Sequence, residues 1–167
     1  VEKYAYIECG EKKIRIYCMW PNLVRTPTVG PEGIEGKLIY GKKGNLKELE
    51  GKDIKGNIIV LDFDSESNWL TLSMLGAKGF IFLKKGEITR REAERKFLKV
   101  PIDIPRFYAG ENSEEILRLA RKEAKVKIFA RMDWERVKDY NIYGYLEGKS
   151  EELKDQLIII SAYYDSI

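Results

Sequence analysis

One stretch, residues 57–83 (NIIVLDFDSESNWLTLSMLGAKGFIFL), constrains the fold more than any other part of the sequence. It opens with an uninterrupted apolar run, Ile58 to Leu61, which is typical of a strand buried on both faces. A polar turn rich in Asp and Ser follows, and Trp69 to Leu75 then has the apolar spacing of a short helix, which Gly76 ends. Residues 79–83 form a second apolar strand. Strand, helix and strand in so short a length predict a parallel β-α-β crossover.

The rest of the chain supplies more strands than helices. Alternation of apolar and polar residues predicts strands, and capping residues before apolar side chains four apart predict helices. The sequence therefore predicts an α/β fold, rich in β-strands, with two or three short flanking helices and one parallel crossover. Because an unpaired apolar strand promotes aggregation, we expect residues 157–160 to pair with residues 141–146 or to join the main sheet. Further strands are predicted at residues 4–9, 14–20, 36–40, 125–132, 141–146 and 157–163, and helices after Thr89 and after Asn112 or Ser113.

Histidine is absent from the whole sequence, and the two cysteines are too few for a four-thiolate metal site. Ser-His and Cys-His catalytic pairs and histidine-containing zinc sites are therefore excluded within this chain. If residues 10–13 form a hairpin turn, Cys9 faces Ile14 and Cys18 faces Ala5, so no disulfide joins the cysteines. The net charge of +3, from 30 basic and 27 acidic residues, is too balanced to indicate a nucleic-acid partner. No apolar stretch is long enough for this segment to insert directly into a membrane.

Two charged segments are candidate binding sites. Asp62, Asp64 and Glu66 alternate, so in an extended strand they share a face that suits a hard cation such as calcium, and helix capping with solubility is the alternative. Residues 84–99 hold seven basic and three acidic side chains, which raises the possibility of a phosphate-binding face. A solvated helix surface is favoured instead, because acidic residues are interspersed and no stacking aromatic residues alternate with the basic ones.

The predicted helix in this basic segment begins at a capping box, Thr89 and Glu92. Ala93 and Phe97 are expected to face the core. The basic side chains of the helix are expected to stay in water; they are Arg90, Arg91, Arg95 and Lys96.

The sequence contains no segment with the features of a nucleotide-binding loop. The turn after the first strand of the crossover has no glycine and three acidic residues, which disfavours a bound phosphate. The segment Gly41–Gly44 lacks the spacing of a P-loop and the Ser or Thr that should follow it.

The C-terminal sequence NIYGYLEGKSEELKDQLIIISAYYDS (141–166) resembles the opening of the di-zinc aminopeptidase family, which includes glutamate carboxypeptidase and the transferrin receptor. In that family an apolar strand leads to a His-Tyr-Asp-Ser motif whose histidine binds zinc. Here Tyr163 takes the histidine position, and a phenol with a pKa of about 10 is a poor zinc ligand near neutrality. The resemblance therefore implies a degenerate zinc site at Tyr163 and Asp165, with no catalytic or metal-binding residue expected in this chain and zinc expected only in a parent protein. The matching positions are Asn141, Gly144, Gly148, Asp155, Ala162, Tyr164, Asp165 and Ser166.

Residues 56–61 (GNIIVL), 75–81 (LGAKGFI) and 100–105 (VPIDIP) resemble landmarks of the protease-associated domain, the module that commonly precedes this motif. Together the two resemblances cover roughly residues 34–166. They imply a compact β-sandwich or open barrel with flanking helices. Three segments follow: residues 1–35 as an N-terminal hairpin and Pro/Gly-rich loop packing on the domain, residues 36–135 as the protease-associated core, and residues 136–167 as the truncated first strands of a peptidase-like domain.

The resemblance implies a non-catalytic protease-associated domain from a larger, membrane-linked, peptidase-like protein, which acts in protein interaction or substrate gating. The expected partner is a protein or peptide, first of all the adjoining peptidase-like domain, and an extracytoplasmic or secreted location is favoured. The chain begins at Val1 without a start methionine, which also favours a segment of a longer protein. Two alternatives stay open. One is an active zinc-dependent aminopeptidase whose remaining metal ligands lie beyond Ile167, and the other is a stand-alone domain that binds an anion or small molecule.

Overall fold

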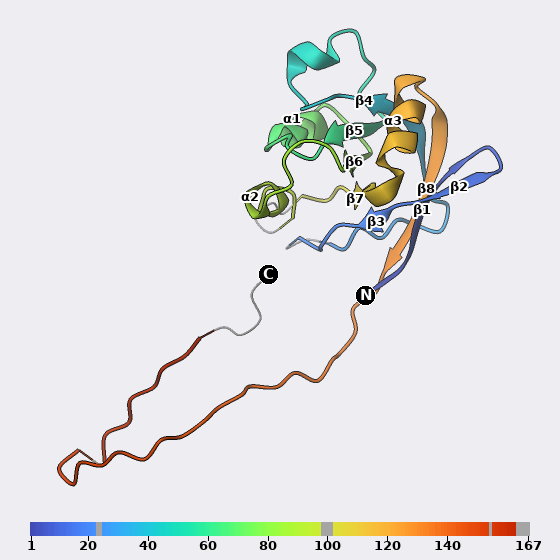
Figure 1. The fold of residues 1–167 in the computed structure, drawn as a ribbon. Coiled ribbons are helices and arrows are strands. Elements are labelled where there is room, and N and C mark those ends of the chain that lie inside the picture. Colours follow the sequence, from blue (N-terminus) through green and yellow to red (C-terminus); the bar gives the residue numbers. More distant parts are fainter. Residues whose placement is uncertain (23–24, 98–101, 154, 163–167) are drawn as a thin grey trace. The chain divides into compact units, whose positions relative to one another are not determined.

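The computed structural model describes residues 1–22, 25–97, 102–153 and 155–162, and the chain divides into two units, Val1–Glu135 (unit 1) and Arg136–Ile167 (unit 2). Every helix and strand of the described residues belongs to unit 1 (Figure 1). In chain order they are β1 (Glu2–Cys9), β2 (Lys12–Arg15), β3 (Tyr17–Cys18), β4 (Ile34–Tyr40), the 3-10 helix η1 (Leu46–Leu49), β5 (Ile58–Asp62), α1 (Asn68–Met74), β6 (Gly79–Leu83), α2 (Arg90–Glu94), β7 (Arg106–Tyr108), the 3-10 helix η2 (Gly110–Asn112), α3 (Ser113–Arg121) and β8 (Lys125–Met132).

The eight strands form one mixed sheet in the order β2-β1-β8-β4-β5-β6-β7-β3. Neighbours from β4 to β7 run parallel, while β1 with β2, β1 with β8, β4 with β8 and β3 with β7 run antiparallel. The predicted α/β, β-rich class is confirmed. The predicted crossover is the pair β5–β6 with α1 between them, and two further parallel pairs flank it.

The two ends of this strand order meet in the sequence. β2 and β3 are separated by Ile16 alone, so the stretch 12–18 pairs with β1 through its first half and with β7 through its second. The amide of Ile16 donates to the carbonyl of Ala5 at 3.1 Å, and the amide of Met19 donates to the carbonyl of Arg106 at 3.1 Å. One bent segment thus forms both edge strands, so the sheet is curved and resembles a barrel.

The helix of the crossover ends as the sequence predicts. Gly76 adopts φ +90°, a conformation that favours glycine. Its amide donates to the carbonyl of Ser73 at 3.0 Å, and the amide of Ala77 donates to the carbonyl of Leu72 at 3.3 Å. These two bonds are the pair of a Schellman motif, which turns the chain out of α1 and into β6. At the other end Ser67 is the N-cap residue, without a hydrogen bond from its side chain.

Both faces of the central strands are buried, which confirms the interpretation of the apolar runs. On one face Ile58 and Val60 join a core that includes Ile116 and Ala120 of α3. On the other, alternate residues of β5 and β6 pack with Trp69 and the rest of the buried side of α1. In Figure 1, α1 and α2 lie on one side of the parallel strands and α3 on the other. Two apolar layers thus sandwich the sheet.

Two local predictions are wrong, and one strand was not predicted. The hairpin turn is shorter than expected, so Cys9 lies opposite Lys12 rather than Ile14, although both cysteines are free as predicted. Lys96 is fully buried instead of facing water. The strand β7 was not anticipated, because the three residues after Pro105 are too few to show an alternation.

Unit 2, taken by itself, has neither of the two predicted strands within its described residues. Residues 141–146 and 157–160 are in no strand, so the strand pairing expected of them is not observed among the described residues. Their apolar side chains are exposed, namely Ile142, Tyr143, Tyr145, Leu146, Leu157, Ile158, Ile159 and Ile160. Among the described residues of the whole chain, the helices are too short or too polar to cross a bilayer.

Candidate functional site

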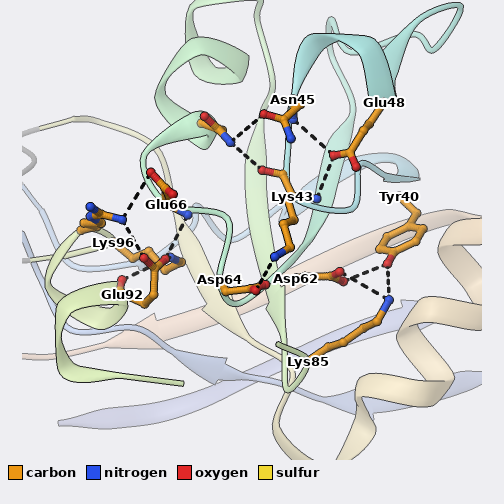
Figure 2. Close-up of polar contacts among 12 residues, drawn as sticks. Tyr40, Lys43, Asn45, Glu48, Asp62, Asp64, Glu66, Lys85, Glu92 and Lys96 are labelled. Atoms are coloured by element: carbon orange, nitrogen blue, oxygen red, sulfur yellow. Dashed lines mark hydrogen bonds and ion pairs between the residues drawn. The ribbon is translucent and has the colours of Figure 1, made fainter. Parts of the chain in front are cut away.

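The parallel strands β4, β5 and β6 end at one edge of the sheet, where open α/β sheets commonly bind ligands. The residues at and just after these ends are polar or charged: Tyr40 closes β4, Asp62 closes β5, and Lys85 follows β6. Figure 2 shows these three side chains pointing toward one another, with Lys43 and Asp64 paired beside them. We treat this carboxyl edge as the candidate functional site.

Tyr40, Asp62 and Lys85 form a closed triangle of polar contacts. The Tyr40 hydroxyl donates to Asp62 Oδ1 at 2.9 Å, the Lys85 ammonium donates to the Tyr40 hydroxyl at 2.7 Å, and it lies 3.4 Å from Asp62 Oδ2. Burial raises the pKa of the Tyr40 phenol, and Lys85 opposes this shift while Asp62 adds to it. The hydrogen bond to Tyr40 raises the pKa of Lys85. Both groups therefore keep their protons near neutrality, and neither serves as a general base.

The possible cation site at Asp62, Asp64 and Glu66 does not form. Asp64 Oδ2 accepts from Lys43 Nζ at 2.7 Å, and Glu66 lies 3.5 Å from Arg95, so each of the acidic groups has a basic partner. Within the described residues no three His, Cys, Asp or Glu side chains gather in a way that could hold a metal ion. Zinc therefore has no fitting donor set in the part of the chain that the structure describes.

A second polar cluster lies beside this edge and centres on the buried carboxylate of Glu92. It accepts from Lys96 Nζ at 2.9 Å, from Arg95 Nη1 at 2.7 Å and from the backbone amide of Glu66 at 3.0 Å. Burial alone would raise the pKa of Glu92, but these donors outweigh it and the pKa is lowered. Glu92 thereby ties α2 to the turn between β5 and α1 (Figure 2).

Lys96 corrects the expectation of a wet basic helix face. Its side chain is fully buried, and its ammonium lies 5.0 Å from the ring centre of Phe63 and 5.2 Å from that of Phe82. Burial lowers its pKa, and Glu92 opposes that shift. Other basic residues of the 84–99 segment are paired with acids: Lys84 with Glu111, Lys85 with Asp62, Arg90 with Glu94, and Arg95 with Glu92 and Glu66. Because most of these basic side chains are already paired, several of them with acidic residues outside the segment, the segment offers little to a phosphate.

The loop between β4 and η1 borders a hollow of about 610 Å³. Asn68 Nδ2 of α1 donates to the carbonyl of Lys43 at 2.9 Å and to Asn45 Oδ1 at 3.3 Å, which fixes the loop against the helix. The volume is in the range of small-molecule sites, but the hollow is an open surface depression and its exposed lining is more apolar than polar. The lining residues are Gly44, Asn45, Leu46, Lys47, Glu48, Asn68 and Thr71.

The degenerate motif residues Tyr163 and Asp165 lie outside the described residues, so the structure places neither.

Arg106 was not predicted from the sequence to have a special role. It is fully buried over the ring of Trp69, and its Nε and Nη2 atoms have no hydrogen-bond partner among the described residues. Burial lowers its pKa to about 10.

The chain matches no protein-family model and no curated protein. Among solved structures it is similar to an aminopeptidase from Aneurinibacillus sp. strain AM-1, with a TM-score of 0.50 and 14% sequence identity. The similarity covers 78% of this chain and 31% of the aminopeptidase chain. At this identity the likeness concerns the fold alone, and the chain spans less than a third of that protein's length. Most of this chain thus has a fold that also occurs in part of an aminopeptidase.

Proposed function

We propose that unit 1 is a non-catalytic domain of the protease-associated kind within a larger, membrane-linked, peptidase-related protein. The observation that carries the proposal is the likeness in fold to part of an aminopeptidase. The chemistry of the carboxyl edge supports a non-catalytic role, because its lysines and its tyrosine hold their protons and its carboxylates are paired. A general base or nucleophile needs the opposite condition.

The domain's role in this proposal is protein interaction or substrate gating on the extracytoplasmic side, with the adjoining peptidase-like domain as first partner. The exposed apolar side chains of residues 142–146 and 157–160 in unit 2 support such a partner. Contiguous apolar side chains are normally covered by other protein surface. We assign them to the first part of the peptidase-like domain.

Zinc analysis and a hydrolysis assay on the same protein test the non-catalytic assignment. Purified chain 1–167, dialysed against zinc and then against buffer, should retain substoichiometric zinc and should not hydrolyse aminoacyl-4-nitroanilides. Retention of one or more zinc ions per chain, with turnover that a chelator abolishes, would establish catalysis in this chain and overturn the proposal.

A binding assay tests the interaction role separately. A fluorescein-labelled, unstructured peptide should gain anisotropy when the chain is added, and unlabelled peptide should reverse the gain. If anisotropy stays flat up to millimolar chain, peptide contact is lost from the proposal while the absence of catalysis is unaffected. The competing function, an aminopeptidase with metal ligands beyond Ile167, requires zinc-dependent turnover by a longer protein that contains this chain.

A further inference from the structure

The side chain of Arg106 is fully buried, and one edge of its guanidinium group is unused. Nη1 donates to the carbonyl of Lys96, while Nε and Nη2 have no hydrogen-bond partner among the described residues. A guanidinium is planar, and its Nε–H and one N–H of Nη2 point in the same direction. The two unpartnered atoms therefore form a single edge, the one with which arginine binds a carboxylate through two parallel hydrogen bonds.

No carboxylate among the described residues compensates the charge of Arg106. The charged group that shifts its pKa is the guanidinium of Arg25, which adds to the lowering caused by burial. Arg25 is itself paired with Asp103 at 2.8 Å, and the side chain of that acid is 73% exposed. Buried arginines are almost always paired, because removing a charge from water costs more than one neutral acceptor returns. An anion is therefore the partner that suits this guanidinium.

The remainder of the Arg106 side chain is held in position. Its guanidinium carbon lies 5.7 Å from the ring centre of Trp69, and the indole NH of Trp69 donates to the carbonyl of Arg95 at 3.2 Å. The Lys96 carbonyl fixes the guanidinium from another side. The backbone is fixed as well, because the amide of Met19 donates to the carbonyl of Arg106 at 3.1 Å. A donor pair that is already oriented loses little conformational entropy when it binds.

The unused edge is closed to solvent in the structure, so a ligand reaches it only when neighbouring side chains move aside. The two segments that bond to Arg106 each continue into an aromatic residue nearer the surface, Met19 into Trp20 and Lys96 into Phe97. The two rings lie 5.7 Å apart; Trp20 is 53% exposed and Phe97 is half-buried. Such rings offer an apolar surface to a group attached to the carboxylate.

We propose that the Nε and Nη2 edge of Arg106 binds the carboxylate of a ligand whose apolar part lies against Trp20 and Phe97. The ligand is an apolar carboxylic acid, either a small molecule or the C-terminus of a peptide that ends in an apolar residue. Arg106 pairs with Phe80 near the start of β6, so this site is distinct from the carboxyl edge of the parallel strands. The proposal does not depend on the relation of unit 1 to a peptidase.

The arginine Nε–H resonances of the ¹⁵N-labelled chain 1–167 test the proposal directly. Benzoate is the probe, benzamide at the same concentration is its neutral control, and sodium chloride keeps the ionic strength constant. The Nε–H resonance of Arg106 should shift and saturate with benzoate and should stay in place with benzamide, because the neutral amide cannot form charge-assisted bonds at both nitrogens. The spectrum of Arg106→Met assigns the resonance by its loss.

A pair of variants separates this site from general charge effects. Arg106→Met should weaken benzoate binding by about tenfold or more, because both hydrogen bonds to the carboxylate are lost. The variant should fold, since methionine fills the space without a buried charge. Arg118→Met removes the same charge from the exposed side of α3 and should change the affinity by less than about twofold. The stabilisation that benzoate gives in urea unfolding measures the affinity of each protein.

Two results would overturn the proposal: an Arg106 resonance that benzoate does not shift saturably, or equal benzoate affinity in Arg106→Met and the unmodified chain. The dipeptide N-acetyl-alanyl-phenylalanine, with its carboxyl group free or amidated, then distinguishes the two sources of carboxylate. Tighter binding of the free dipeptide than of benzoate supports a peptide C-terminus, and weaker binding supports a small carboxylic acid. Equal binding of the free and amidated dipeptides would contradict recognition of the carboxylate.

Discussion

Removing either partner of the buried Lys96–Glu92 ion pair should strongly lower the free energy of unfolding. The ammonium and carboxylate lie 2.9 Å apart, the lysine side chain is fully buried, and the glutamate side chain is 10% exposed. At an effective dielectric constant of about 20, two unit charges at this distance attract by about 6 kcal/mol, and the penalty for removing both from water offsets most of it. If one partner is removed, the desolvation penalty of the remaining buried charge is no longer compensated.

Glu92→Leu should therefore destabilise unit 1 by about 3–5 kcal/mol, or lower its melting temperature by about 10 °C or more. Lys96→Met should cost less, because Arg95 and the Glu66 amide still hold the Glu92 carboxylate. The double variant should recover part of the loss and leave a residual deficit from the unpaired Glu66 amide. The coupling energy of this cycle should be about 2–3 kcal/mol.

Urea unfolding followed by tryptophan fluorescence measures the cycle, since Trp69 is buried and its indole NH donates to the carbonyl of Arg95 at 3.2 Å. The matched control is Lys84–Glu111, also a Lys–Glu pair, at 3.0 Å but exposed. The same cycle there should give a coupling within error of zero. Coupling below about 0.5 kcal/mol for Lys96–Glu92 would refute the reasoning, because a buried pair would then behave as a surface pair.

The sign of the pH dependence follows from Glu92. Its pKa is lowered from the ordinary value of 4.5, so below that value the unfolded chain binds a proton that the folded chain does not. The contribution of Glu92 is fully present above pH 4.5 and is lost as the pH falls through its folded pKa. Between these limits Glu92→Leu should lose less stability on acidification than the unmodified protein.

Three further outcomes are expected. Arg106→Met should stabilise the chain by about 1–3 kcal/mol in urea unfolding, because two guanidinium nitrogens are buried without a hydrogen-bond partner among the described residues. The gain should shrink as the pH rises above about 10, because the folded state then releases the guanidinium proton before the unfolded state does. A clear loss of stability in the variant would show that the charge is compensated. Burial raises the pKa of the Cys18 thiol to about 12, so iodoacetamide at pH 8 should alkylate it on the order of a thousandfold more slowly in the folded chain than in urea, and comparable rates would contradict this. Amides of Ile158–Ile160, which lie in no strand, should exchange hydrogen rapidly while those of β5 stay protected, and slow exchange would show a pairing that the structure lacks.

Local patterns were enough to predict the elements that bury a regular apolar face. The run from Ile58 to Leu61 and the alternation of residues 125–132 correspond to β5 and β8, and the capping candidate Asn112 is the N-cap residue of α3. Each of these signals lies within one element. β7 was not predicted, because its three residues form a strand only through pairing with β6 and β3, which are distant in sequence.

The candidate site was less accessible to sequence reasoning for the same physical reason. The Tyr40–Asp62–Lys85 triangle joins residues that come together only when β4, β5 and β6 align in register. The spacing of Glu92 and Lys96 does indicate a helical ion pair, but their burial depends on Phe63 and Phe82 closing over the lysine. In unit 2 the apolar pattern of residues 157–160 predicts a strand, and a strand needs a neighbouring strand to pair with.

The carboxyl edge shows what kind of function its charges permit. Each lysine there donates to a carboxylate or a phenol, which raises the pKa of Lys43 through Asp64 and that of Lys85 through Tyr40. Lysines that keep their protons, and carboxylates already bound to them, stabilise the turns but do not transfer protons near neutrality.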